Sequence, residues 1–243
     1  MIDDTRIHGN IGPRTVMPAN LALVIFDCDG VLIDSEALCN RIVAEELTKQ
    51  GWDLTLADCH RRFVGLTFAD TKRVAEAHLG RSLGIGWIDN ITQRVTKVMA
   101  EEADLIPGAR QALEATIALG LPFRIASNSS RQEMAAKFAR TGLASLIGNR
   151  IHSAHDLIAA GRRGKPAPDL FLEAAAAENV LPEACLVIED SLAGVQAAAA
   201  AGMICLGFSP DGDAAHLRLA GALPFASMYA LPDLIRSFLH RTQ

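Results

Sequence analysis

Short apolar runs alternate along the chain with longer segments in which apolar residues recur every three or four positions. Short runs are typical of buried strands, and the longer segments are typical of amphipathic helices. The expected strands are residues 21–26, 122–126, 185–188 and 203–206, with shorter ones at 151–152 and 223–226. Helices are expected from Ser35, as an N-cap, to Gly51, and over residues 67–79, 85–103, 109–119, 132–140, 169–178, 192–201 and 231–240.

The order of these elements predicts the fold class. Strands that alternate with helices are typical of a parallel sheet whose strands are joined by right-handed crossovers. Residues 36–103 carry only helical patterns and interrupt that alternation. We therefore expect an α/β fold with a Rossmann-like parallel-sheet core, residues 21–35 and 104–243, and an all-helical domain inserted after the first strand, residues 36–103. Residues 1–20 are interpreted as a leader of uncertain order.

Composition excludes several classes of protein. Of 243 residues, 50% are hydrophobic and 21% charged, which is typical of a soluble globular chain. The net charge of −5 argues against binding to duplex nucleic acid, which normally requires a basic surface. The apolar run at 21–26 is far too short to span a membrane, and residues 1–20 lack the apolar stretch of a secretory signal.

The five cysteines form no C-x-x-C pair, which argues against a zinc site or a disulfide framework. We therefore expect a reduced, cytoplasmic protein. As a separate expectation, it is a monomer or a small homo-oligomer.

Polar residues follow the expected strands at the end where α/β proteins bind ligands, beyond the carboxyl ends of the sheet. A lysine also stands in the loop that precedes the helix at 169–178. The residues expected to meet at this edge are Asp27, Asp29, Ser127, Asn128, Lys165, Glu189 and Asp190.

Four carboxylates in one crevice require a cation. Two like charges at 4 Å repel by about 4 kcal/mol at an intermediate dielectric constant. The candidate ligands contain only oxygen donors, which favours a hard ion such as Mg²⁺. Mg²⁺ beside a lysine suits phosphoryl transfer, where catalysis depends mainly on positioning and charge neutralisation.

The sequence resembles the haloacid dehalogenase superfamily, in its phosphatase branch with a helical cap. Residues 27–36, DCDGVLIDSE, are similar to that family's first motif, and Ser127-Asn128 to its second. Lys165 in residues 164–169, GKPAPD, matches the third motif, and residues 189–191, EDS, match the fourth. The four motifs occur in the family's order, and the resemblance covers roughly residues 21–240.

This resemblance implies a role for each motif residue. Asp27 would be the nucleophile that forms an aspartyl-phosphate, and Asp29 the general acid and base. Ser127, Asn128 and Lys165 would bind the phosphoryl oxygens. Mg²⁺ would be held by Asp27, the backbone carbonyl of Asp29, Asp190 and Glu189. The expected partner is a small phosphorylated metabolite, a sugar or sugar-acid phosphate.

Substrate choice is expected to lie in the insert, where residues 64–68 resemble a cap specificity loop. Five basic residues flank that loop and could meet an anionic substrate tail or simply form a solvated helix face: His60, Arg61, Arg62, Lys72 and Arg73.

Four alternatives remain open. β-Phosphoglucomutase-type mutases carry a histidine and an arginine where this chain has Cys39 and Phe68. Haloacid dehalogenases lack the second aspartate, which is present here as Asp29. Phosphonoacetaldehyde hydrolases use a cap lysine at the position where this chain has Phe68, which makes that branch a poorer match. A non-catalytic phosphate-binding protein would need neither Asp27 nor Asp29.

Overall fold

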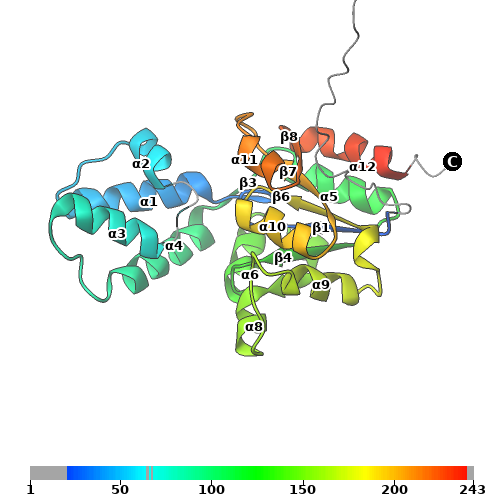
Figure 1. Ribbon diagram of the computed structural model, residues 1–243, viewed down its shortest axis with the longest axis horizontal. Helices are drawn as coiled ribbons and strands as arrows, with labels where there is room; N and C mark the ends of the chain where they lie inside the picture. Colours follow the sequence, from blue (N-terminus) through cyan, green and yellow to red (C-terminus); the bar gives the residue numbers. More distant parts are fainter. Residues whose placement is uncertain (1–20, 64–65, 67, 240–243) are drawn as a thin grey trace, which may run out of the picture.

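The computed structural model describes residues 21–63, 66 and 68–239, which form a three-layer α/β core with a group of helices beside it (Figure 1). Six parallel strands in the order β5-β4-β1-β6-β7-β8 form the middle layer. They are β1 Leu23–Phe26, β4 Phe123–Ser127, β5 Ile151–Ser153, β6 Cys185–Glu189, β7 Ile204–Phe208 and β8 Leu223–Phe225. The expected α/β fold with a Rossmann-like parallel sheet is confirmed.

Side chains alternate across β1, so the central strand is buried on both faces. Val24 and Phe26 point into one apolar cluster, while Leu23 and Ile25 point into the other. The helices that cover the first face are α5 Ala109–Ala118, α6 Arg131–Arg140, α7 Ala144–Ile147 and α12 Leu231–Leu239, with the 3-10 turn Met228–Ala230. Those of the second face are α8 Ala154–Ala159, α9 Asp169–Ala176, α10 Leu192–Ala200 and α11 Ala215–Leu219, and a second 3-10 turn spans Pro182–Ala184.

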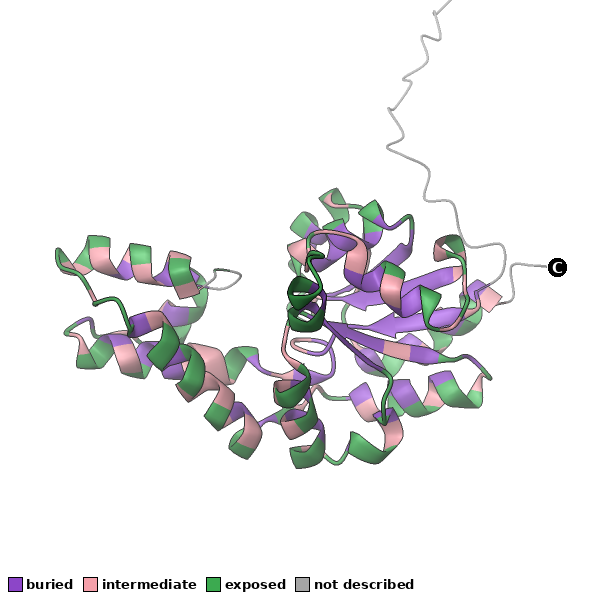
Figure 2. Ribbon diagram, turned by 90° about the horizontal axis from the view of Figure 1, so that it is seen from below, coloured by how far each residue is buried: buried purple, intermediate pink, exposed green. Residues whose placement is uncertain are grey.

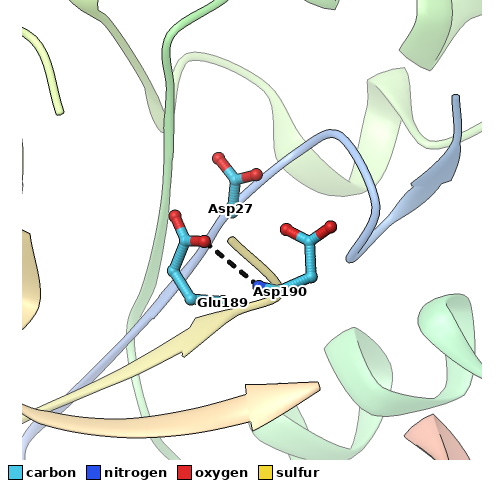
Figure 3. A group of neighbouring side chains, drawn as sticks. All are labelled: Asp27, Glu189 and Asp190. Carbon is cyan, nitrogen blue, oxygen red and sulfur yellow. Dashed lines mark hydrogen bonds between the residues drawn. The ribbon is translucent and has the colours of Figure 1, made fainter. Parts of the chain in front are cut away.

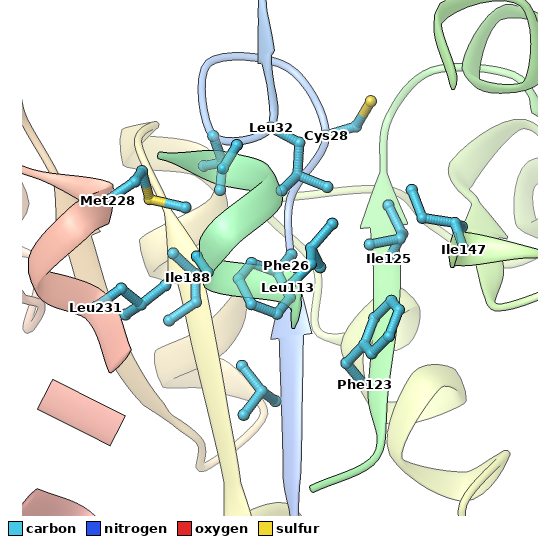
Figure 4. Close-up of a cluster of buried hydrophobic side chains, with 14 of the residues drawn as sticks. Phe26, Cys28, Leu32, Leu113, Phe123, Ile125, Ile147, Ile188, Met228 and Leu231 are labelled. Atoms are coloured by element: carbon cyan, nitrogen blue, oxygen red, sulfur yellow. The ribbon is translucent and has the colours of Figure 1, made fainter. Parts of the chain in front are cut away.

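The cluster on the first face fixes the start of the loop after β1. Figure 4 shows Phe26 among side chains from β4, β6 and α5. The ring of Phe123 packs edge-on against that of Phe26, with 6.3 Å between the ring centroids. Cys28 and Leu32, which belong to the loop itself, are fully buried in the same cluster. Cys28 is therefore directed into the core, and the loop is anchored on both sides of Asp29.

The residues between β1 and α5 form a helical insert. It consists of α1 Glu36–Lys49, α2 Leu56–Phe63, α3 Phe68–Leu79 and α4 Trp87–Glu102. Two short antiparallel strands, β2 Ile33–Asp34 and β3 Asp104–Leu105, join it to the core. The insert has an apolar cluster of its own, and its outer faces are exposed (Figure 2).

Several local expectations differ from the structure. Ser35 stands at the N-cap position of α1, but its backbone is already helical and its side chain makes no capping bond, so the predicted cap is wrong. The strands β2 and β3, the helices α7, α8 and α11, and α2 as a separate helix were not expected. By contrast, Ser191 caps α10, and its side chain accepts a hydrogen bond from the backbone N–H of Gly194.

Some expectations lie outside the described residues, namely the leader 1–20, Val64, Gly65 and Thr67 of the expected specificity loop, and the ends of two helices at Thr67 and His240. Among the helices that the structure describes, none has the length and apolar character needed to cross a membrane.

Glu133 links the insert to the core. It forms a capping box with Ser130 at the start of α6, and its Oε1 accepts a 2.9 Å hydrogen bond from Oγ1 of Thr96 in α4. Burial, which raises a carboxyl pKa, is outweighed by these hydrogen bonds and by the charge of Lys137, so the pKa of Glu133 is lowered.

The lowered pKa gives a prediction for acid stability. A carboxyl with a depressed folded-state pKa stabilises the fold above its unfolded pKa of about 4.5 and loses this effect as pH falls through the folded value. We expect wild type to be more stable than Glu133→Gln at pH 6, and the difference to shrink toward pH 3. Urea unfolding at several pH values measures this difference in stability. A difference that does not change with pH would contradict a lowered pKa of Glu133.

Candidate active site

Three neighbouring strands bring the predicted polar residues to one edge of the sheet. β1 pairs with β4 on one side and β6 on the other, so their carboxyl ends lie side by side. A single pocket at this edge is lined by Asp27, Asp29, Ser127, Asn128, Ser129, Glu133, His155, Lys165 and Ser191. Residues that are up to 164 positions apart in the sequence, from Asp27 to Ser191, therefore surround one pocket.

Lys165 is the central cation of the site. Its Nζ donates hydrogen bonds to Oδ1 of Asp27 at 2.6 Å, to Oε1 of Glu189 at 2.6 Å and to the carbonyl of Ala126 at 2.8 Å. The side chain is only 3% exposed. An ammonium has three donors, so Lys165 is fully hydrogen-bonded and holds Asp27 in a defined orientation.

Glu189 is fully buried and is held from both sides. Oε1 accepts from Lys165, while Oε2 accepts from the backbone N–H of Asp190 at 3.1 Å and from the N–H and hydroxyl of Ser191 at 3.0 and 2.9 Å. The structure thus uses Glu189 to orient Lys165 and the turn into α10. Only Oε1 keeps capacity for another partner, which makes Glu189 a poorer candidate metal ligand than Asp190.

Gly194 leaves the space that Glu189 occupies. A Cβ atom at this position would lie 1.8 Å from Cδ of Glu189, which is a severe clash with a buried side chain. We expect Gly194→Ala to lower the free energy of unfolding by about 1–3 kcal/mol, the usual cost of overpacking.

Chemical denaturation measures this cost. Gly86→Ala is the matched control, because only Asn90, at 3.9 Å, comes near its added Cβ. Equal stability of the two variants would show that Glu189 is not held as described.

Asp190 lies across from the loop that follows β1. A Cβ at Gly30, which has a φ of +77°, would lie 1.9 Å from Oδ2 of Asp190, so glycine permits this close approach. Carboxylate oxygens of Asp27, Glu189 and Asp190 all lie within 4.8 Å of one another. Figure 3 shows the three groups gathered at the strand ends, with Glu189 bonded to the backbone of Asp190.

The crowded acids change one another's pKa. Burial raises the pKa of Asp27 to about 7; the ion pair with Lys165 opposes the shift, and the charges of Glu189 and Asp29 add to it. Burial, with the charges of Glu189 and Asp27, also raises the pKa of Asp190 well above its usual range. The pKa of Lys165 is raised despite its burial, because Asp27 and Glu189 stabilise the ammonium.

This donor set fits a hard divalent cation. The candidate ligands offer only oxygen atoms, and three acidic groups face one lysine. Such a site carries an excess of buried negative charge that a cation would neutralise, and oxygen ligands of this kind suit Mg²⁺.

Comparison with known proteins identifies the family. Residues 21–202 match the family model described as a haloacid dehalogenase-like hydrolase. The chain belongs to this hydrolase family. The resemblance seen in the sequence motifs, and the expectation that the protein is a hydrolase, are therefore confirmed.

Curated relatives of this haloacid dehalogenase-like hydrolase include phosphatases and mutases. The 6-phosphogluconate phosphatase of Escherichia coli (strain K12) is 27% identical over 89% of this chain and 95% of its own length. The β-phosphoglucomutase of Mycobacterium bovis is 28% identical over 85% of this chain and 89% of its own. A solved structure of a family hydrolase from Deinococcus radiodurans R1, with bound phosphate and sodium, is 32% identical with a TM-score of 0.79 and covers 90% of this chain and 97% of that one.

Ser127 and Asn128 of this hydrolase lie at the end of β4, where they were expected. Ser127 is 2% exposed, and its Oγ accepts from the backbone N–H of Ser129 at 3.0 Å. Oδ1 of Asn128 accepts from the backbone N–H of Lys165 at 3.2 Å. Asn128 therefore holds the loop that carries Lys165, a contact that the sequence did not indicate.

Sequence reasoning missed Lys137 and three residues that line the pocket, namely Ser129, Glu133 and His155. Nζ of Lys137 donates to Oδ1 of Asp29 at 2.6 Å, and Oγ of Ser129 donates to Oδ2 at 2.7 Å. The available signal was the position of Lys137 on the apolar stripe of its helix, next to Met134 and Phe138, which are both buried.

The insert residues that were expected to bear on specificity lie partly among the described residues. Phe68 packs against the insert's apolar cluster. Cys39 is half-buried; burial, with the charge of Asp29, raises the pKa of its thiol to about 11. The basic residues near the expected loop form salt bridges within the insert: Arg61 with Asp58, Lys72 with Glu76, Arg73 with Asp70, and His60 with Glu36 if protonated. Arg62 lies over the ring of Trp52. These contacts favour the solvated helix face.

Proposed function

We propose that this haloacid dehalogenase-like hydrolase is a Mg²⁺-dependent phosphatase that hydrolyses a small phosphorylated sugar or sugar acid. One observation carries the proposal: the carboxylate of Asp27 is oriented by a buried lysine in a pocket that Asp29 and Ser127 also line. Pure phosphate binding would not require two carboxylates beside the phosphate, because like charges repel.

In the first step, Asp27 attacks phosphorus. A bond forms between a carboxylate oxygen of Asp27 and phosphorus, and the bond from phosphorus to the ester oxygen breaks. Asp29 gives a proton to that ester oxygen, which leaves as an alcohol. Ser127 and Lys165 bind phosphoryl oxygens, and Lys165 exchanges one of its present acceptors to do so.

In the second step, water cleaves the aspartyl-phosphate. Asp29, now a carboxylate, takes a proton from the water as the water oxygen bonds to phosphorus. The bond from phosphorus to Asp27 breaks, and inorganic phosphate and the original carboxylate are released. Asp29 thus ends the cycle with the proton that it lost in the first step.

The metal would be held by Asp27, Asp190 and the backbone carbonyl of Asp29, with Glu189 beside them. When bound, Mg²⁺ neutralises charge on the phosphoryl oxygens and on the acids that surround them.

We further propose that residues 36–103 act as a cap that excludes water when it closes over the pocket. Five free cysteines support a reduced compartment such as the cytoplasm.

A substrate panel tests the proposal. Purified protein is incubated with sugar phosphates, sugar-acid phosphates and p-nitrophenyl phosphate, and released phosphate is measured with Mg²⁺ and with EDTA. We expect Mg²⁺-dependent release from at least one sugar-type ester. No release from any ester in the presence of Mg²⁺ would refute the phosphatase proposal.

A phosphosugar mutase is the second candidate, because a β-phosphoglucomutase is among the relatives. The residues at Cys39 and Phe68 depart from the mutase pattern, which favours hydrolysis. NMR analysis of products decides: free phosphate supports the phosphatase, whereas an isomerised phosphosugar would establish the mutase.

A further inference from the structure

Lys137 is a buried lysine in the middle of a helix, which is an expensive place for a charge. Its side chain is 6% exposed, and it shares the inner face of α6 with Met134 and Phe138. Burying an ammonium is unfavourable unless it is paired and hydrogen-bonded. Of the lysines in the described ranges, only Lys137 and Lys165 have side chains this deeply buried.

Each of these two lysines is paired with one of the two aspartates of the loop after β1, Asp27 and Asp29. Lys165 binds Asp27 at 2.6 Å, and Lys137 binds Asp29 at the same distance. The pKa of Lys137 is raised although burial alone would lower it, because the charge of Asp29 stabilises the ammonium. The charge balance of the site is therefore built from two lysines that come from different segments of the chain.

The carboxylate of Asp29 is held at both oxygens by the segment that follows β4. Oδ1 accepts from Lys137 and Oδ2 from Ser129. Ser129 is itself fixed, because its N–H donates to Ser127 and its carbonyl accepts from the hydroxyl of Ser153 at 2.8 Å. With both oxygens held, the side chain of Asp29 is still 29% exposed, and Asp29 lines the pocket.

We propose that Lys137 is a positioning residue that holds the Asp29 carboxyl in the orientation needed for proton exchange with the ester oxygen of the substrate. This inference rests on the proposed phosphatase function and adds a residue to it. An ammonium can only donate, so Oδ1 remains an acceptor. The proton exchanged with the substrate is then on Oδ2, which accepts from the Ser129 hydroxyl when the group is a carboxylate. Lys137 itself touches neither substrate nor phosphorus.

Leaving-group dependence tests this role. Lys137→Met keeps most of the side-chain volume and removes the charge. Alkyl esters need a proton on the departing oxygen, whereas p-nitrophenolate leaves without one. Because Asp29 also acts as the base in the second step, which both esters share, the comparison uses kcat/KM, which reports only the first step. General acid catalysis contributes about 10²–10⁴-fold, and losing only its orientation should lower kcat/KM on an alkyl phosphate about tenfold relative to kcat/KM on p-nitrophenyl phosphate.

Lys49→Met is the matched control, since Lys49 is an exposed lysine paired with Glu46 in the insert. The ratio of its two kcat/KM values should equal that of wild type. If Lys137→Met does not fold, Ser129→Ala removes the hydroxyl on Oδ2 and should shift the ratio in the same direction.

One result would overturn the proposal. An unchanged ratio of the two kcat/KM values, whether both are kept or both fall equally, would show that Lys137 does not orient the proton donor for the leaving group. This outcome leaves the phosphatase function standing. Absence of wild-type turnover on every ester of the panel would instead remove the phosphatase function, and this role with it.

Discussion

Replacement of Asp27 by asparagine is expected to abolish turnover while leaving the fold intact. Asparagine has the shape of aspartate but cannot form the acyl phosphate, and removing a covalent nucleophile lowers kcat by a factor on the order of 10⁴ or more. Steady-state hydrolysis of the best substrate from the panel measures this loss. Asp53→Asn, the same change at an exposed position of the insert, is the control and should keep full activity.

The same variant should not lose stability. Burial, with the neighbouring acids, raises the pKa of Asp27 from 3.8 to about 7, so the folded protein disfavours the charged form. A raised carboxyl pKa means stability that is present below the unfolded pKa and lost as pH rises through the folded one. In EDTA, asparagine should therefore raise the melting temperature relative to wild type, and more at pH 8 than at pH 5.

Loss of activity together with loss of structure would contradict this prediction. Such a result would mean that Asp27 is needed for the Lys165 network and not for chemistry. Retained turnover by a well-folded Asp27→Asn protein would exclude the aspartyl-phosphate route altogether. The combination of an inactive and equally or more stable variant is what a functional carboxylate in a repulsive site should produce.

The sheet could be predicted from sequence because its strands carry a strong local signal. β1 and β6 are short apolar runs that end in acidic residues, so both their position and the end that faces the pocket were visible. The parallel order of strands followed from the alternation with helices. These are local patterns, and they need no knowledge of which residues meet.

The elements that were missed lack such patterns. β2 and β3 have two residues each. They form strands only because the segment that enters the insert and the segment that leaves it lie side by side and pair. Ser35 looked like an N-cap, but a cap depends on backbone conformation, which composition does not determine. The short helices α7, α8 and α11 have too few turns for an apolar period to appear.

The active site likewise combines features that local sequence patterns predict with contacts that only the fold determines. The motif residues follow strand ends, so their convergence could be predicted, but the partner of each charged group could not. A lysine in an amphipathic helix is usually on its solvent face, and only the fold reveals that Lys137 points at Asp29. The number of hydrogen bonds at Glu189 likewise depends on the turn into α10.

Removing the central cation is the second change with a large expected effect. Lys165→Met would leave Asp27 and Glu189 buried side by side without an ammonium. Breaking a buried ion pair by deleting one partner typically lowers stability by about 3–5 kcal/mol, because the remaining charge is uncompensated. Loss of a donor to the phosphoryl group should also lower kcat by about 10²-fold or more.

Urea unfolding in EDTA measures the stability term, and Lys49→Met is again the control. That lysine is 62% exposed in an i,i+3 pair, and its removal should change stability by no more than about 0.5 kcal/mol. A loss below about 1 kcal/mol for Lys165→Met would contradict the strong pairing of this buried cation.

A second substitution separates charge from packing. Glu189→Gln keeps the shape of the side chain and the acceptor for Ser191, but removes one of the two charges that Lys165 compensates. If uncompensated charge causes the instability, Lys165→Met with Glu189→Gln should be more stable than Lys165→Met alone. If lost packing causes it, the double variant should be at least as unstable as the single one. Recovery of stability without recovery of activity would assign Lys165 two separable roles, one in compensating buried acids and one in binding the phosphoryl group.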